Sequence, residues 1–339
     1  MKKLSVILAL LLALGLMLVA CGGTDEEQQN GEPGQGVDDG AKDRVDDEHA
    51  DWVKDVTILT GGEAGVYFPI GVAIGDILDA NVEGMTAAGV TSGASLVNVA
   101  ELDEAEAEMA LVQNDMAYYA LEGTQMFEGA LSGFQGLATL YPETIQIVTT
   151  ADTGIETVQD LVGKRVAIGD VGSGTEANAT QILEAHGITH DDFSVEFMGF
   201  GDASTALQDG NVDAAFVTAG TPTGAIQQLG AVTDVRLVSI EAEQIDTLVN
   251  KYPYYTEVEI SADTYGLDTD VSTVAVQAML IVREDLPEEQ VYEITKAIFD
   301  NLQVLQNTHD RGHDITLETA LDGMSIDVHP GAQRFYDEP

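Results

Sequence analysis

The chain has 339 residues, with 59 acidic against 13 basic side chains and a formal net charge of −46. This charge excludes nucleic acid as a partner, because neutralising phosphates requires clustered Lys and Arg. The apolar content of 45% is enough for folded cores, and the length suits two domains of ordinary size. We interpret the excess of acid as halophilic adaptation to a saline or alkaline exterior, where salt screens self-repulsion. The alternative interpretation is a family that is acidic for no environmental reason.

The N-terminus resembles an export signal. Residues 1–20 join a basic start to an apolar run of signal-peptide length, which is too short to span a bilayer comfortably. The run ends in Leu18-Val19-Ala20-Cys21, similar to a bacterial lipobox, and Cys21 is the only cysteine of the chain. We therefore predict a lipoprotein signal peptide over 1–20 and lipidation of Cys21. Residues 21–54 are dense in Gly, Asp, Glu and Gln. We predict that they form an acidic flexible tether from the extracytoplasmic face of the cell membrane.

From residue 55 onward, apolar runs of strand length alternate with segments of helical periodicity. We expect strands at 56–60, 85–90, 108–113, 135–141, 145–150, 165–168, 195–200, 214–217 and 236–239, and a strand-like β-branched run at 271–282. We expect helices at 66–80, 95–102, 115–122, 176–186, 203–208, 222–229, 241–250 and 287–306. This alternation favours an α/β fold in which mainly parallel sheets have helices on both faces.

We divide this folded part into two lobes. Lobe 1 begins with residues 55–150, and lobe 2 covers 151–262 after a crossing segment. Residues 263–339 are expected to return to lobe 1 and to supply hinge helices. Each lobe is expected to be a mainly parallel sheet flanked by helices, with a ligand cleft between the two lobes.

Two glycine loops each follow a predicted strand and precede a predicted helix. The first, over 60–69, has the sequence TGGEAGVYFP, and the second, over 169–175, has the sequence GDVGSGT. Such a turn directs unpaired backbone N–H groups and the positive end of a helix dipole at one point. We expect the two loops to face the shared cleft, one from each lobe.

The second loop has competing interpretations. Its residues 172–177 match the dinucleotide pattern G-x-G-x-x-A, with Asp191 and Asp192 at a suitable distance. A lone match is a weak signal, and an exported lipoprotein has little access to nicotinamide, so we predict no cofactor. The structural alternative is a helix start capped by Ser173 or Thr175, which holds in any interpretation. The same N–H groups are candidates for holding a ligand carboxylate.

The search for catalytic residues finds no candidate. The six histidines lack the H-E-x-x-H spacing of a metal site, and no G-x-S-x-G nucleophile elbow occurs. Carboxylate pairs are so frequent that none stands out as an acid/base set. We therefore predict no catalytic residue, no metal ligand and no enzymatic activity.

Further loops rich in hydroxyl groups and glycine follow other predicted strands. They include 91–95 with Asn98 after it, 113–115, and 218–222. Strand ends of this kind are where α/β sheets bind ligands, and such loops suit hydrogen bonding to a small polar solute. Taken singly, each is equally typical of an ordinary turn or helix cap.

In their order along the chain, these motifs resemble the TAXI group of solute-binding proteins, which serve TRAP (tripartite ATP-independent periplasmic) transporters. The similarity covers residues 55 to 336. The landmarks are TGG at 60–62 with GVY at 65–67, SG at 92–93 with Ser95 and Asn98, ALVQ at 110–113 with Asp115, LVGKRV at 161–166, GSGTE at 172–176, AG at 219–220, KYPYY at 251–255, REDLP at 283–287 and HPGA at 329–332.

The resemblance implies a two-lobed, periplasmic-binding-protein-like fold of type II that closes on small carboxylates, either glutamate-like amino acids or dicarboxylates. The chain departs from the family pattern at Phe68, where a second Tyr is common, and at Ala94, where Gly is common. Arg283 and Arg236 are candidate partners for an anion, with surface ion pairs as the alternative. The implied ligand contacts are Gly62, Tyr67, Ser92, Ser95, Gln113, Ser173, Gly174, Thr175, Ala219 and Gly220.

The expected function is that of a lipid-anchored, non-enzymatic receptor that passes its solute to the membrane subunits of a TRAP permease. An ion gradient, and not this chain, would then supply the energy for transport. The alternative is an extracellular ligand-sensing receptor on the same fold that feeds a signalling partner.

Overall fold

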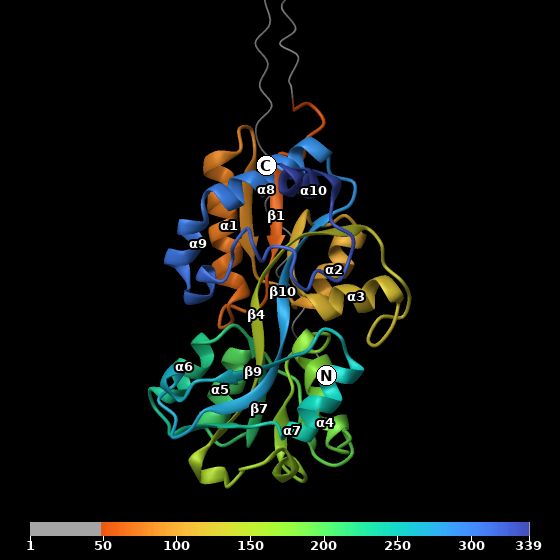
Figure 1. Cartoon of the computed structure of the whole chain (residues 1–339). Coiled ribbons are helices and arrows are strands. Elements are labelled where there is room, and N and C mark those ends of the chain that lie inside the picture. The colour runs from red at the N-terminus through yellow and green to blue at the C-terminus, as the bar shows by residue number, and fades with distance from the viewer. Residues whose placement is uncertain (1–48, 339) are drawn as a thin grey trace, which may run out of the picture. The chain divides into compact units, whose positions relative to one another are not determined.

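A mixed sheet flanked by helices organises residues 49–338, the part of the chain that the computed structural model describes (Figure 1). The predicted signal peptide, Cys21 and most of the predicted tether lie outside these residues. The strands are β1 (Asp55–Leu59), β2 (Thr86–Val90), β3 (Met109–Gln113), β4 (Phe134–Thr150), β5 (Arg165–Ala167), β6 (Ser194–Glu196), β7 (Ala214–Ala219), β8 (Val235–Val238), β9 (Thr256–Ile260) and β10 (Val271–Arg283). The helices include α1 (Tyr67–Asn81), α2 (Ser95–Asp103), α3 (Asn114–Glu122), α4 (Gly174–Ala185), α5 (Phe200–Gln208), α6 (Gly224–Gly230), α7 (Ala242–Lys251), α8 (Glu288–Asp300), α9 (Leu302–Thr308) and α10 (Pro330–Asp337).

The strand order is β2-β1-β3-β10-β4-β7-β5-β6, with β8 paired to β4 and β9 paired to β10. The outer strands are parallel: β1 pairs with β2 and β3, and β5 pairs with β6 and β7. The long strands β4 and β10 are antiparallel to their neighbours. Crossover helices are the usual covering of such parallel strands, and the predicted α/β fold class is confirmed.

The strands β4 and β10 lie in the middle of the strand order, and each is long enough to run through both ends of the fold. The start of β4 pairs with β10, and its last residues, 144–150, pair with β7 and β8. In Figure 1 the helices α1, α2, α3, α8, α9 and α10 surround β1 at one end, which we call the first half. The helices α4 to α7 lie with β7 and β9 at the other end, the second half.

Several predicted boundaries differ from the structure for local reasons. The strands expected at 135–141 and 145–150 are one strand, β4, because Pro142 pairs opposite Gln277 next to a register shift that absorbs the missing N–H. The helix expected at 287–306 is two helices. Asn301 separates them, with its side chain donating to the Ala297 carbonyl oxygen at 2.8 Å and its backbone leaving the helical region.

Close backbone packing fixes the position of α1 and therefore of the first glycine loop. A Cβ on Gly89 of β2 would lie 2.5 Å from the Gly71 carbonyl carbon of α1, and a Cβ on Gly75 would lie 3.1 Å from the Gly89 nitrogen. Larger residues at these positions would push the helix away from the strand. The face of α1 that packs on the sheet is buried at Ile70, Ile74, Ile77 and Leu78.

Candidate ligand-binding site

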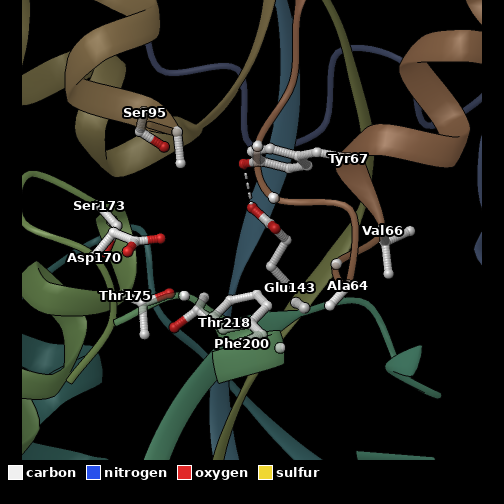
Figure 2. A pocket seen from close by; sticks show the side chains of 18 of the residues that line it. Ala64, Val66, Tyr67, Ser95, Glu143, Asp170, Ser173, Thr175, Phe200 and Thr218 are labelled. Carbon is white, nitrogen blue, oxygen red and sulfur yellow. Dashed lines mark hydrogen bonds between the residues drawn. The ribbon is translucent and has the colours of Figure 1, made fainter. Parts of the chain in front are cut away.

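A cavity of about 470 Å³ is lined by residues of both halves and by Glu143, near the middle of β4. Both halves and β4 itself contribute to its wall (Figure 2). The lining residues are Gly61, Gly62, Glu63, Ala64, Gly65, Val66, Tyr67, Ala94, Ser95, Gln113, Glu143, Asp170, Ser173, Gly174, Thr175, Gly199, Phe200, Gly201, Asp202, Thr218 and Ala219. A volume of this size suits a small-molecule ligand.

Four helices begin at this cavity. The first residues of α1, α2, α4 and α5, which are Tyr67, Ser95, Gly174 and Phe200, all line it. The N-terminal N–H groups of a helix lack intrahelical partners and carry a partial positive charge. The strand–loop–helix pattern of the sequence therefore brings four weakly positive helix ends to one place.

Side-chain hydrogen bonds hold the first glycine loop in position. The Thr60 hydroxyl donates to the Val90 carbonyl oxygen at 2.6 Å. The buried Asn98 amide donates to the carbonyl oxygens of Thr60 at 2.8 Å and Leu111 at 2.7 Å, which ties the end of β1 to the middle of β3. Ser92 donates in turn to Asn98 Oδ1 at 2.5 Å. Ser92 therefore supports the loop from behind and does not line the cavity.

The second glycine loop satisfies much of its own backbone. Ser173 Oγ accepts from the Glu176 backbone N–H at 3.2 Å, which confirms the predicted cap. The Glu176 carboxylate accepts from the Gly172 N–H at 2.7 Å, and the Ser173 N–H donates to the Asp170 carbonyl oxygen at 3.0 Å. These three N–H groups, of Gly172, Ser173 and Glu176, are therefore engaged within the loop, and the expectation that this loop holds a ligand carboxylate stays a prediction for its other N–H groups.

Eight of the ten predicted contacts line the cavity and two lie outside it. Ser92 is outside for the reason given, and Gly220 is outside because its Cα faces the Arg311 side chain. A Cβ on Gly220 would overlap with that side chain and would lie 3.3 Å from the Tyr141 ring. The eight that line it are Gly62, Tyr67, Ser95, Gln113, Ser173, Gly174, Thr175 and Ala219.

The most buried ionisable group of the cavity lining, Glu143, was missed by the sequence reasoning. Its side chain is on β4 and accepts a hydrogen bond from the Tyr67 hydroxyl at 2.7 Å, as Figure 2 shows. The residue is 2% exposed, and this burial raises the pKa of the Glu143 carboxyl well above its usual value. The Tyr67 hydrogen bond opposes that shift, and the nearby Asp115 carboxylate adds to it. A proline followed by a glutamate, at 142–143 within a mainly apolar segment, was the one signal in the sequence.

Three further acids lie around the mouth of the cavity. Glu63, Asp170 and Asp202 all line it and are exposed. Partial burial raises the pKa of Asp170, and the nearby Asp202 charge raises it further. Together with Glu143 these residues give the cavity a strongly acidic wall.

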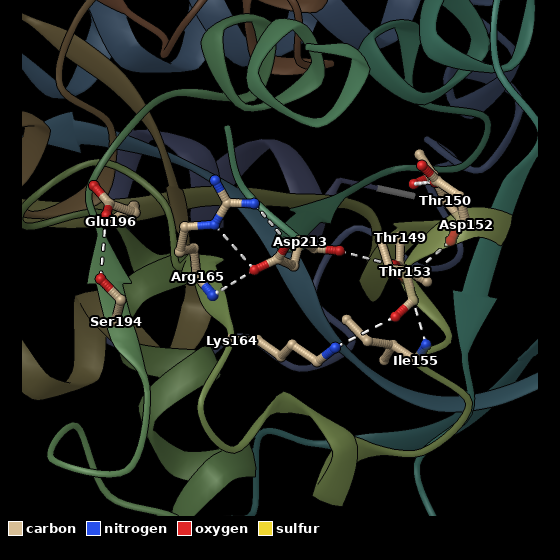
Figure 3. Close-up of polar contacts among 10 residues, drawn as sticks. All are labelled: Thr149, Thr150, Asp152, Thr153, Ile155, Lys164, Arg165, Ser194, Glu196 and Asp213. Atoms are coloured by element: carbon tan, nitrogen blue, oxygen red, sulfur yellow. Dashed lines mark hydrogen bonds and ion pairs between the residues drawn. The ribbon is translucent and has the colours of Figure 1, made fainter. Parts of the chain in front are cut away.

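The basic side chains near the sheet are engaged elsewhere. Arg165 forms a two-pronged ion pair with Asp213, with its nitrogens at 2.7 Å and 3.1 Å from the two carboxylate oxygens (Figure 3). Lys164 donates to the Thr153 carbonyl oxygen at 3.3 Å in the same region. These contacts keep two cations of the second half away from the cavity.

Neither arginine considered as an anion partner reaches the cavity. Arg283 pairs with Glu108 at 3.3 Å and Asp285 at 2.5 Å, so the predicted alternative of an ion pair is confirmed for this residue. Arg236 is an exposed residue of β8 outside the lining. Over residues 49–338, no group of three or more His, Cys, Asp or Glu side chains is placed to hold a metal ion. In the same range, no helix has the length and apolar character that a membrane span requires.

The two departures from the family pattern have different surroundings. Phe68 is half-buried in the first turn of α1 and lies outside the lining. Ala94 lines the cavity and adopts φ 65° and ψ −154°, a region that glycine occupies freely and other residues avoid. The second departure therefore places backbone strain in the wall of the site.

The strand order and the cavity define a periplasmic-binding-protein-like α/β fold. A structure described as a periplasmic transporter is similar at a TM-score of 0.54 and 13% identity, over 84% of this chain and 94% of that one. A protein from Bordetella bronchiseptica RB50 matches at 0.52 and 17%, over 84% and 82%. A candidate L-cystine ABC transporter from Listeria monocytogenes matches at 0.50 and 16%, over 78% and 98%. At these identities the likeness concerns the fold alone.

The family is established by sequence. A model of the NMT1-like family matches residues 58–339, and the chain belongs to that family. The matched range includes both halves of the fold and every residue that lines the cavity.

Proposed function

We propose that this protein is an extracytoplasmic solute-binding protein that captures a small polar molecule and delivers it to a membrane transporter. The main observation that supports this proposal is the cavity between the two halves, to which four helix N-termini and a buried carboxylate contribute. The structural likeness to a periplasmic transporter supports this assignment. The chain would act as a receptor and not as an enzyme.

The finer proposal follows the TAXI resemblance. The transporter would be a TRAP permease, and the solute would be a small carboxylate, either an amino acid or a dicarboxylate. Lipidation of Cys21 would hold the protein on the extracytoplasmic face of the cell membrane. Residues 55–150 and 263–339 would form one lobe and 151–262 the other, and ligand binding would shift the population toward the closed form.

A blocking variant tests the proposal with the full chain. Gly62 is exposed and lines the cavity, and a Cβ built on it meets no heavy atom within 4 Å. Gly62→Trp should therefore fill the cavity while leaving the fold intact. Gly129 has equally open surroundings outside the cavity, so Gly129→Trp is the matched control.

Thermal-shift screening against small organic acids, amino acids and amines would identify a binder, and calorimetry would measure its affinity. A ligand at 100 times its Kd stabilises the native state by about 2.7 kcal/mol. We expect this stabilisation in the parent chain and in Gly129→Trp, and its loss in Gly62→Trp. Equal binding by both variants would show that the cavity is not the ligand site.

A further inference from the structure

The charge of the cavity is one-sided. Among the described residues that line it, four are acids and none is Lys, Arg or His. Glu143 lies at the bottom, and Glu63, Asp170 and Asp202 lie toward the mouth. The net charge of −46 adds a long-range field of the same sign, which attracts cations and repels anions.

Two buried side-chain oxygens of residues that line the cavity have no hydrogen-bond partner. Gln113 is 3% exposed and Thr218 is 4% exposed, and neither Gln113 Oε1 nor Thr218 Oγ1 makes a hydrogen bond in the structure. One ends β3 in the first half and the other belongs to β7 in the second half. Buried polar atoms are normally paired, so these oxygens indicate a polar ligand between the halves: Gln113 Oε1 can only accept a hydrogen bond, and the Thr218 hydroxyl can accept or donate one.

The geometry of β4 and β7 places Thr218 near Glu143. Thr218 pairs directly with Ile145, two residues along β4 from Glu143, so the two polar residues are diagonal neighbours across the strand pair. The Tyr67 hydroxyl donates to Glu143 Oε2 and orients the carboxylate. The rings of Tyr67 and Phe200, which line the cavity, add aromatic surface that attracts a cation.

We propose that the solute carries a protonated amine, which binds the Glu143 carboxylate while its other donors reach Gln113 Oε1 and Thr218 Oγ1. This inference rests on the proposed function and narrows its solute class. A carboxylate on the same solute would lie at the uncapped N-terminus of α1, where Val66 provides no side-chain cap. The class is therefore an amino acid without net negative charge, or a simple amine, and dicarboxylates lacking an amine are excluded.

Binding of an amine at Glu143 should change the number of protons that the protein holds, and this change can be measured. The titratable groups that face Glu143 are Tyr67 of α1, Asp115 of α3 and Tyr141 of its own strand, and none of them is a cation. Burial raises the pKa of the Glu143 carboxyl, so this group holds its proton more tightly than an exposed carboxyl does. A bound protonated amine favours the ionised carboxylate and so lowers this pKa, and the proton that it displaces from Glu143 passes to solvent. Affinity for the amine therefore rises with pH until Glu143 is already ionised in the free protein.

The experiment uses matched compounds on the full chain. Each α-amino acid of a library with three to six carbons is paired with its 2-oxo and 2-hydroxy analogues, and alkylamines and dicarboxylates are included. Thermal shift selects binders, and calorimetry in buffers of different ionisation enthalpy counts protons. We expect binding only by amine-bearing compounds, and proton release on binding.

Two isosteric variants separate a specific role of Glu143 from general charge. Glu143→Gln should weaken amine binding by about 10- to 100-fold, the range for a hydrogen bond to a charged group, and should abolish proton release. Asp170→Asn, at the mouth, should weaken it less than fivefold and leave proton release unchanged. The denaturation midpoint of each empty variant serves as the check on folding.

The outcomes distinguish this inference from the function on which it rests. Binding of 2-oxo, 2-hydroxy or dicarboxylic acids in preference to amines overturns the amine assignment and leaves the solute-binding function standing. An unchanged amine affinity in a folded Glu143→Gln variant also overturns it. Absence of binding by every compound, amines included, counts against both.

Discussion

The two glycine loops of the cavity have similar sequences and different chemistry. The loop over 169–175 bonds internally, because Ser173 caps the helix and Glu176 binds the Gly172 N–H. The loop over 60–69 leads into α1 with Val66 at the cap position and no capping side chain. It contributes the Tyr67 side chain instead, which reaches Glu143 on β4.

Because of this difference, the two loops, which form opposite walls of the cavity, contribute differently to ligand binding. The second loop uses the N–H groups of Gly172, Ser173 and Glu176 for its own hydrogen bonds, so fewer of its donors remain for an anion. The first loop leads into an uncapped helix start and carries the tyrosine that orients a buried acid. It therefore offers a ligand both a weakly positive helix end and a negative partner. The same local pattern of strand, glycines and helix therefore does not predict the same contribution to binding.

The largest effect should come from removing the Tyr67 ring. Tyr67→Ala should lower the free energy of unfolding by about 3–5 kcal/mol, because the ring is 8% exposed and its loss leaves a cavity. Chemical denaturation would measure it. Tyr67→Phe keeps the ring and should cost only about 1–3 kcal/mol for the hydrogen bond to Glu143. Ser173→Ala, the counterpart in the other wall, should cost about 1 kcal/mol. A cost for Tyr67→Ala no greater than that would contradict the asymmetry.

The contact that joins the two halves behind the cavity should make stability depend on pH. Asp115 of α3 accepts from Asn178 of α4 at 2.9 Å, and burial raises the pKa of Asp115 to about 6 from its usual 3.8. The native state therefore holds this proton more tightly than the unfolded state does. Its contribution is most favourable below pH 3.8, is lost as pH rises from there to about 6, and is constant above that. The loss amounts to about 3 kcal/mol, at about 1.4 kcal/mol per pKa unit.

Asp115→Asn isolates this contribution from the other acids. We expect the difference in unfolding free energy between variant and parent to grow in favour of the variant between pH 4 and pH 7, as measured by urea denaturation. Glu143→Gln serves as the comparison, because the raised pKa of Glu143 has the same sign. A difference between Asp115→Asn and parent that stays constant over this range would show that Asp115 keeps its ordinary pKa.

A pair of glycine variants tests the two loops against each other. A Cβ on Gly174 would overlap with the Gln113 carboxamide, which crosses from the other half, whereas a Cβ on Gly62 would meet nothing within 4 Å. Gly174→Ala should therefore hold the halves apart and weaken solute binding about tenfold, or about 1.4 kcal/mol. Gly62→Ala should change affinity less than twofold. Calorimetry with the identified binder measures both, and equal losses would mean that the walls are equivalent.

The sequence predicted the loop residues in the walls of the cavity better than it predicted Glu143 at the bottom. Glycine loops after strands have a local signature, so sequence patterns alone indicate the residues near 62, 67, 95, 113, 174 and 219. Glu143 had no such signature, because it is one of 59 acids and becomes special only when β4 passes between the halves. Ser92 and Gly220 follow the same loop pattern but face Asn98 and Arg311, and only tertiary packing decides which way a loop residue faces.

The smallest expected effect concerns the strained residue of the first wall. Ala94 at φ 65° and ψ −154° carries a strain of about 1–3 kcal/mol that glycine would not. Since glycine loses about 0.5–1 kcal/mol more in backbone entropy, Ala94→Gly should stabilise the protein by about 1 kcal/mol in urea denaturation.

Ala105, exposed and at φ 57°, provides the control away from the cavity. Ala105→Gly should leave solute affinity unchanged. Ala94→Gly should lower it about twofold, because a freer backbone beside Ser95 must be ordered again on binding. A loss of stability in Ala94→Gly would show that the first wall is relaxed, and the contrast between the two loops would then rest on Tyr67 alone.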